Sequence, residues 1–422
     1  MTKHTSSKLL VSILLGITIG LLLGGFAPAT GTAVKFIGEL FLKALFVMVV
    51  PLVMSSMIVG VSALGDVRKL GPLGGWTMLY FMATTAIAVL LGLLLVLSIE
   101  PGVAADKQAL SAGAEAASKV AERMQNRPDT LGEFVYTILT SLIPKNLFAA
   151  MVNAEVLPLI VFSLVFGGVL TTLGEKGEHV IRFFDGVNDA IMAMVMLLMW
   201  TAPVGIGALI AGRLGDAGGF AGFWPELVNL GAYAATVVIG LLIHSVVVLP
   251  LILRFLGKQN PLEVARNLST ALTTAFSTSS SSATLPLTME AVIAEQGISE
   301  RTARFVLPLG ATVNMNGTAL YEAVAAVFIA QSYGIDLTAA QTLIVAVTAT
   351  LAAVGAAGIP EAGLVTMVIV LKAVNLPVEG IALILVIDWF LDRCRTTVNV
   401  WGDVVGAAVI DRLEINGSER PS

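Results

Sequence analysis

The chain has 422 residues, of which 56% are hydrophobic and only 13% are charged. Its mean hydropathy of +0.90 lies outside the range of soluble globular proteins. The net charge of -5 arises from 24 basic and 29 acidic residues, mostly in short clusters between apolar runs, so no nucleic acid partner is expected. The single cysteine, Cys394, excludes a disulfide framework and a cysteine-based metal site within the chain. We therefore expect a membrane protein whose partners are the lipid bilayer and small solutes, and we expect no cofactor.

The first apolar run covers about residues 9–25 and follows Lys3 and Lys8. It could be a cleaved signal peptide, because Ala27-Pro28-Ala29 offers small residues beyond it. We favour a retained helix, because the run is longer than a usual signal core. The two lysines predict a cytoplasmic N-terminus.

Further apolar runs cover about residues 37–64, 73–99, 132–172, 186–214 and 227–256. A helix needs about 20 apolar residues to cross the hydrocarbon core, so these runs predict an all-α, multi-pass protein. Basic flanks such as Arg68 and Lys69 mark the cytoplasmic side. Alternation then places the polar stretch 100–131 outside, and its four basic residues do not count against this because long loops are largely exempt from the charge rule.

Beyond residue 258 the apolar segments are interrupted by stretches rich in Ser, Thr, Gly and Asn. Unpaired backbone groups in hydrocarbon cost several kcal/mol, so such stretches must be buried in protein or line a wet cavity. The interrupted segments 262–293 and 337–372 lie on either side of a segment at 301–334. Paired interrupted segments are typical of a transporter's binding site, and we interpret them as re-entrant hairpins that enter from opposite sides.

The last apolar segment carries a polar stripe. On a helix, six polar residues fall within an arc of about 100°, while Arg393 projects to another face. The six are Asp388, Asp392, Arg395, Thr396, Asn399 and Asp403. A charge at bilayer depth costs about 2.5–3.5 kcal/mol at least, so the stripe must face the protein interior. It could be a structural ion-pair seam, but it also suits an acidic amino acid and a small cation: Asp392 for the ammonium group, Arg395 for the side-chain carboxylate, and Asn399 with Asp403 as oxygen ligands.

Two further polar residues lie alone in apolar surroundings. Glu322 lies in an otherwise apolar helix, where loss of water favours the protonated carboxyl, and we interpret it as a proton carrier. The alternative is a permanent salt bridge with Arg393 or another cation. His244 lies among Leu, Ile and Val, and we expect a buried, hydrogen-bonded structural role. The four serines 279–282 lack the Gly-x-Ser-x-Gly setting of a nucleophile, so the sequence does not indicate an enzyme.

Four ordered blocks resemble the signatures of the glutamate/aspartate transporter family, the dicarboxylate/amino acid:cation symporters, and the similarity extends to about residue 414. The blocks are Ser279-Ser-Ser-Ser282-Ala-Thr-Leu-Pro286, Asn314-Met-Asn-Gly-Thr318, Gly355-Ala-Ala-Gly-Ile-Pro360 and Asp392-Arg-Cys-Arg395-Thr-Thr-Val-Asn399-Val-Trp-Gly-Asp403. The resemblance implies eight transmembrane helices, two re-entrant hairpins, a homotrimer, an elevator-type movement and a plasma (inner) membrane location.

The resemblance also divides the chain. It implies scaffold parts at 1–72 (helices 1–2) and 132–226 (helices 4–5), and an extracytoplasmic loop at 100–131. The transport part comprises helix 3 at 73–99 and a core at 227–414, which contains helix 6, hairpin 1 (262–293), helix 7, hairpin 2 (337–372) and helix 8. Residues 415–422 would form a cytoplasmic tail.

The resemblance implies site residues as well. The expected substrate contacts are Ser280, Ser281, Thr318, Gly358, Asp392, Arg395, Thr396 and Asn399. The expected cation ligands are a first set at Gly310, Asn314, Asn399 and Asp403 and a second set at Thr84, Thr85, Asn314 and Asn316, and Thr312 is a further expected ligand. The proton carrier candidates are Glu322 and Arg393. Relatives that carry neutral amino acids lack an arginine at position 395, so Arg395 implies acidic substrates.

Two positions depart from the family pattern. Asn316 stands where the family usually has Asp, and Ala353 stands where Ser is frequent. An amide keeps an oxygen ligand but removes a negative charge, which weakens the hold on sodium. Together with Glu322, these departures predict an importer of glutamate or aspartate coupled to H⁺, Na⁺ or both, leaning on protons. The alternatives are a symporter of C4-dicarboxylates, against which Asp392 argues because these substrates lack an ammonium group, and a channel, for which no charged pore ring is present.

Overall fold

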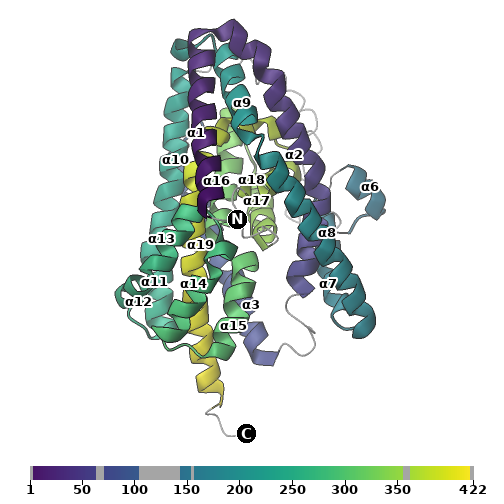
Figure 1. Ribbon diagram of the computed structural model, residues 1–422, viewed down its shortest axis with the longest axis vertical. Coiled ribbons are helices and arrows are strands. Elements are labelled where there is room, and N and C mark those ends of the chain that lie inside the picture. The colour runs from purple at the N-terminus through teal and green to yellow at the C-terminus, as the bar shows by residue number, and fades with distance from the viewer. Residues whose placement is uncertain (1–2, 63–70, 104–142, 154–155, 355–361, 419–422) are drawn as a thin grey trace.

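The computed structural model describes residues 3–62, 71–103, 143–153, 156–354 and 362–418, and every regular element in these ranges is helical (Figure 1). The predicted all-α class is confirmed. Gly358, which was predicted to contact substrate, and most of the loop 100–131 lie outside the described ranges.

The first group of helices is formed by the N-terminal part of the chain. Helix α9 (Ala202–Asp216) packs along α1 (Lys3–Phe26) and α2 (Pro28–Ser62), and α2 also packs against α7 (Val156–Leu170) and α8 (Glu175–Met199). An ion pair of 2.6 Å between Lys35 Nζ and Asp216 Oδ2 joins α2 to the end of α9. The short helix α6 (Leu147–Val152) lies beside α7.

Two of the apolar runs contain more than one helix. The run 186–214 is divided into α8, which begins earlier at Glu175, and α9. Pro203 lies in the first turn of α9 and has no N–H to donate to the Met199 carbonyl, so the helix is interrupted there. The run 132–172 contains α6 and α7 as separate helices, and Asn146 caps α6 by accepting from the N–H groups of Phe148 and Ala149.

The second group surrounds the C-terminal helix. Helix α3 (Gly71–Ile99) packs against α16 (Asn316–Ser332), and α10 (Phe220–Ile243) packs against α3, α16 and α19 (Ile381–Ser418). The chain continues from α10 through the π-helical segment η3 (His244–Val248), α11 (Leu249–Ile252) and a second π-helical segment, η4 (Leu253–Gly257). Pro250, which lacks an N–H, lies between the two π-helical segments, where it disturbs the regular ladder.

Two helical hairpins are present at the interrupted segments. The first comprises α12 (Pro261–Asn267), α13 (Ser269–Thr278) and α14 (Ser281–Ala294), with α13 packed on α14. The second comprises α17 (Ala339–Val354) and α18 (Ala362–Ala373), which also pack together. Between them along the chain, α15 (Glu300–Val313) is followed by α16, and a 3₁₀ turn, η5 (Val378–Gly380), leads into α19.

Three described segments are long and apolar enough to cross a membrane: Leu73–Ile99, Val228–Gly257 and Glu300–Ser332. The protein buries 39% of the most apolar window in each of the first two, but all of the window in the third. The segment formed by α15 and α16 is therefore the centre of the second group, and α19, yellow in Figure 1, runs beside it.

Candidate substrate and cation site

The polar stripe of α19 is buried as the 3.6-residue periodicity predicts. All six of its residues are at most 6% exposed, although they include three carboxylates and a guanidinium. Arg393 is only half-buried and faces elsewhere, because its guanidinium donates to the Trp389 carbonyl at 2.7 Å and lies 5.9 Å from the centre of the Trp389 ring. The stripe therefore faces the interior of the second helix group.

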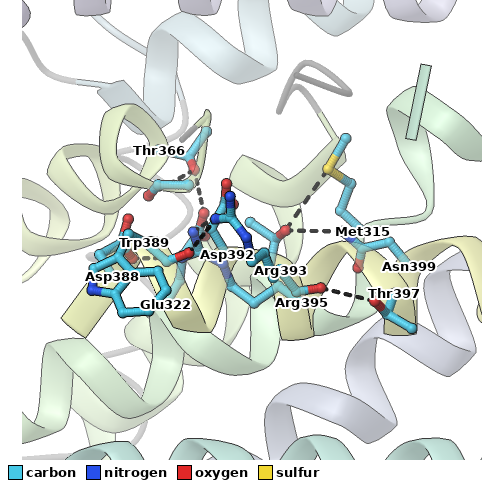
Figure 2. A network of polar contacts seen from close by, with 12 residues as sticks. Met315, Glu322, Thr366, Asp388, Trp389, Asp392, Arg393, Arg395, Thr397 and Asn399 are labelled. Carbon is cyan, nitrogen blue, oxygen red and sulfur yellow. Dashed lines mark hydrogen bonds and ion pairs between the residues drawn. The ribbon is translucent and has the colours of Figure 1, made fainter. Parts of the chain in front are cut away.

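Arg395 lies in a cluster of charged side chains that includes Asp388 and Asp392 (Figure 2). Its Nη2 donates to Asp392 Oδ1 at 2.7 Å, and its Nη1 lies 3.1 Å from Asp388 Oδ1. The guanidinium carbon lies 3.8 Å from the centre of the Tyr321 ring of α16, which is a close cation–π contact. A buried guanidinium with two carboxylates and an aromatic face is held in a defined position, which suits recognition of a planar anion.

The break between α15 and α16 brings backbone groups to the polar stripe. Asn314 and Met315 have φ near -100° and ψ near +60°, so the helix is not continuous there. Asn399 of α19 accepts from the Gly317 N–H at 2.8 Å, and its Nδ2 donates to Thr318 Oγ1 at 3.1 Å. Asn399 thus satisfies one of the free N–H groups at the start of α16 and joins α16 to α19.

One set of predicted cation ligands is assembled around Asp403. Asn314 Nδ2 donates to Asp403 Oδ1 at 2.9 Å. Gly310 lies against the same carboxylate, because a Cβ at this position would come 2.4 Å from Asp403 Oδ1. Asn399 lies one turn before Asp403 on the same face of α19. Carboxylate, amide and backbone oxygens are the ligands that small hard cations prefer.

The second set of predicted ligands joins α3 to the α15–α16 break. Thr84 Oγ1 lies 3.4 Å from Asn314 Oδ1, and Thr85 Oγ1 donates to Asn316 Oδ1 at 2.8 Å. Asn316 Nδ2 is buried beside the Cα of Gly402 and has no hydrogen-bond partner in the described part of the chain. Thr312 is not brought into either set by a described contact, since its hydroxyl donates to the Leu309 carbonyl of its own helix.

The serines of the first hairpin form its turn. Ser279 ends α13 with φ at +51°, and the Ser280 hydroxyl caps α14 by accepting from the Ala283 N–H at 3.1 Å. Ser280 and Ser281 are buried, as is Thr396 on α19, and both α13 and α14 pack against α19. The described contacts of Ser280 and Ser281 do not include Arg395, so their role toward a substrate stays a prediction.

The second hairpin contributes contacts that the sequence reasoning missed. Thr366 of α18 donates to the Glu322 carboxylate of α16, and both side chains are buried. Gly363 lies against the guanidinium of Arg395. Ala353 of α17 is fully buried. No local signal identifies Thr366 or Gly363, although Tyr321 could have been noted because it precedes Glu322 in the chain.

His244 is fully buried at the start of η3, as expected, but the expectation of a hydrogen bond was wrong. Neither ring nitrogen has a partner among the described residues. The π-helical turn instead leaves the next carbonyl, that of Ser245, to accept from Trp401 Nε1 at 3.1 Å. Among all the residues that the structure describes, no group of three or more His, Cys, Asp or Glu residues is placed to hold a metal ion.

A helical fold with hairpins and an interrupted helix around buried charges is typical of membrane transporters. The model of the sodium:dicarboxylate symporter family matches residues 9–413, and the chain belongs to this family. Excitatory amino acid transporter 3 of Oryctolagus cuniculus is 41% identical over 96% of this chain and 84% of its own length.

The similar proteins include transporters named for different classes of amino acid. An excitatory amino acid transporter of Caenorhabditis elegans is 40% identical over 94% of this chain and 85% of its own length. Neutral amino acid transporter B(0) of Homo sapiens is 39% identical over 97% of this chain and 81% of its own length. Overall identity therefore does not separate acidic from neutral substrates.

Proposed function

We propose that this chain imports acidic amino acids, glutamate or aspartate, together with coupling cations. The observation that carries this proposal is Arg395, a guanidinium buried on the polar face of α19 beside Asp392. A neutral amino acid offers a buried arginine no side-chain anion, whereas an acidic one offers a planar carboxylate that can accept two parallel hydrogen bonds.

The neighbouring groups suit the rest of such a substrate. Asp392 can exchange its contact with Arg395 for one with the substrate ammonium group, which leaves the guanidinium to the substrate side-chain carboxylate. Thr318 and Asn399, joined by their hydrogen bond, present polar groups at the start of α16. The names of the excitatory amino acid transporter relatives are in keeping with this reading.

Sodium and protons are both proposed as coupling ions. The oxygen-rich set of Gly310, Asn314, Asn399 and Asp403 is suited to sodium. The set at Thr84, Thr85 and Asn316 is weaker, because an amide lacks the negative charge of a carboxylate and the Thr85 hydroxyl occupies its oxygen. Glu322 is suited to carry a proton, since it is fully buried and accepts a hydrogen bond from the uncharged hydroxyl of Thr366.

The architecture proposed for this function has eight transmembrane helices and two re-entrant hairpins in the plasma (inner) membrane. The helices around α2 would form the scaffold of a homotrimer, and those around α19 would move as an elevator. Two observations support this division: the two packing groups, and exposed apolar stripes such as Val11, Leu15, Ile19 and Leu22 on α1, which lipid or a partner subunit would cover.

Uptake by the purified full-length chain in liposomes tests the proposal. We expect labelled aspartate to enter when an inward sodium or proton gradient is imposed separately, and unlabelled glutamate to compete better than malate or fumarate. Arg395→Cys should lose acidic substrates and keep or gain neutral ones, whereas Arg395→Lys retains a cation and serves as the matched control. Unchanged affinity of Arg395→Cys for aspartate would contradict the assignment, and stronger competition by malate would favour a dicarboxylate transporter.

A further inference from the structure

Two of the acceptors beside the hydroxyl of Thr366 belong to different helices. One is the carboxylate of Glu322 on α16, and the other is the Gly363 carbonyl in the first turn of α18, at 3.3 Å. Thr366 is 4% exposed and Glu322 is fully buried, so water does not compete freely for these contacts. A hydroxyl has one proton and therefore makes one full donation at a time.

We propose that Thr366 is a positioning residue that passes the protonation state of Glu322 to the backbone of the second hairpin. When Glu322 is ionised, it can only accept, and the Thr366 proton goes to its carboxylate. When Glu322 is protonated, its O–H can donate to Thr366 Oγ1, and the Thr366 proton is released to the Gly363 carbonyl. This inference rests on the proposed function of Glu322 as proton carrier.

Gly363 gives this rearrangement a route to the substrate site. A Cβ at position 363 would lie 2.9 Å from Arg395 Nη1 and 3.1 Å from its Cζ, so the backbone of the hairpin lies directly on the guanidinium. A hydroxyl that bonds back to a carbonyl in its own helix bends that helix slightly. When the Thr366 proton moves between the Glu322 carboxylate and the Gly363 carbonyl, the backbone that lies against the Arg395 guanidinium therefore changes its position.

The electrostatic surroundings of Glu322 come from few elements. The charge of Arg395 on α19 interacts electrostatically with Glu322. The same helix also carries Asp388, Asp392 and Arg393. On α10 the titratable side chain near this cluster is Tyr233, and on α16 it is Tyr321. Helix α18 carries Lys372 at its far end, while α3 and α17 contain no Asp, Glu, His, Lys or Arg. Thr366 is thus the uncharged group whose removal changes the hydrogen bonding of Glu322 without changing any charge.

The sign of the effect follows from hydrogen-bond strength. The donation of Thr366 to an ionised carboxylate is charge-assisted and roughly twice as strong as the neutral bond made with the protonated form. Removal of the hydroxyl therefore destabilises ionised Glu322 more than protonated Glu322. We expect Thr366→Val to move the half-maximal pH of proton-driven aspartate uptake upward by about 0.5–1 pH unit.

The experiment compares four proteins reconstituted in liposomes: wild type, Thr366→Val, Thr366→Ser and Thr348→Val. Thr366→Ser keeps the hydroxyl and should restore the wild-type pH profile. Thr348→Val removes another buried hydroxyl of the same hairpin, one that donates only within α17, to the Ile344 and Val345 carbonyls, and should leave the profile unchanged. If Thr366→Val does not fold, Thr366→Ala is used in its place, because this variant also lacks the hydroxyl.

The outcomes separate the relay from the transport function. If the pH gradient drives uptake by the wild type, and Thr366→Val and Thr366→Ser have the same pH profile of uptake, the relay alone is overturned. A wild-type protein that takes up aspartate without any response to the pH gradient overturns proton coupling and the relay together. An upward shift in Thr366→Val that Thr366→Ser reverses supports the relay, and infrared spectra should then show that the Glu322 carboxyl band, identified by its loss in Glu322→Gln, moves in Thr366→Val but not in Thr366→Ser.

Discussion

Asn316→Asp restores a carboxylate to a site where the chain carries an amide, and its effect on sodium can be worked out from the contacts. The new carboxylate would stand 2.8 Å from the Thr85 hydroxyl and near Asn314. Two unit charges 4 Å apart attract each other by about 4 kcal/mol at an effective dielectric constant near 20. Loss of hydration by the ion and the carboxylate offsets part of this gain. A net gain of about 1.4–2.8 kcal/mol corresponds to sodium binding about 10- to 100-fold more tightly.

The same substitution should weaken the protein when sodium is absent. A carboxylate at this depth costs about 2.5–3.5 kcal/mol. Thr85 already donates to the amide oxygen of Asn316, a bond of about 0.5–1.5 kcal/mol, so donation to a carboxylate, at about 1.5–3 kcal/mol, returns only about 1–1.5 kcal/mol more. The sodium-free protein should therefore lose roughly 1–2.5 kcal/mol of stability, and thermal unfolding with and without sodium measures this loss.

The assay for the first effect is aspartate uptake as a function of sodium concentration. In Asn316→Asp the half-saturating sodium concentration should fall and the dependence should become steeper, because one more sodium ion takes part. Asn316→Ala removes the amide without adding charge and should show neither change. An unchanged sodium dependence in Asn316→Asp, with transport intact, would refute the reasoning that charge at position 316 limits sodium binding.

Two further predictions concern packing and topology. Asn399→Leu should lower stability by about 1–3 kcal/mol, because the Gly317 N–H loses its acceptor and Thr318 Oγ1 loses a donor, and an unchanged thermal unfolding midpoint would contradict this. Single cysteines introduced within 100–131 in a Cys394→Ser background should react with a membrane-impermeant reagent from outside only, and labelling from the cytoplasmic side alone would overturn the proposed topology.

The polar face of α19 was predictable because its positions follow one rule, the 3.6-residue period of a helix. All residues of the stripe belong to one helix, so no long-range contact was needed to group Asp388 with Asp403. The interrupted segments were predictable for a similar reason, since polar and small residues cannot continue an apolar helix in hydrocarbon. The break at Pro203 also had a local signal, which the strong hydropathy of the surrounding run obscured.

The partners of these residues could not be predicted from local sequence. Thr366 meets Glu322 across 44 residues, and Thr85 meets Asn316 across 231 residues. These contacts depend on how α3 and the second hairpin pack on α16, and no spacing rule links such positions. The resemblance to a family grouped Thr85 with Asn316, but it did not supply Thr366, Gly363 or the stacking of Tyr321 on Arg395. The role of each residue toward substrate and cation stays a prediction.

The buried charges lead to a last prediction, that cations and the acidic substrate strengthen each other's binding. Among the described residues of the second group, five acidic side chains are buried, Asp388, Asp392, Asp403, Asp411 and Glu322, and the one buried guanidinium is that of Arg395. An acidic amino acid adds a further net negative charge, and an unpaired charge in such a medium is very costly. Binding of sodium or a proton should therefore raise the affinity for aspartate, and by linkage aspartate must raise the affinity for the cation by the same factor. Calorimetric titration of aspartate at several sodium concentrations, and of sodium with and without aspartate, measures both factors at a fixed pH. An affinity for aspartate that does not depend on sodium or on pH would show that the core tolerates the added charge without a cation, and the coupled mechanism would then be wrong.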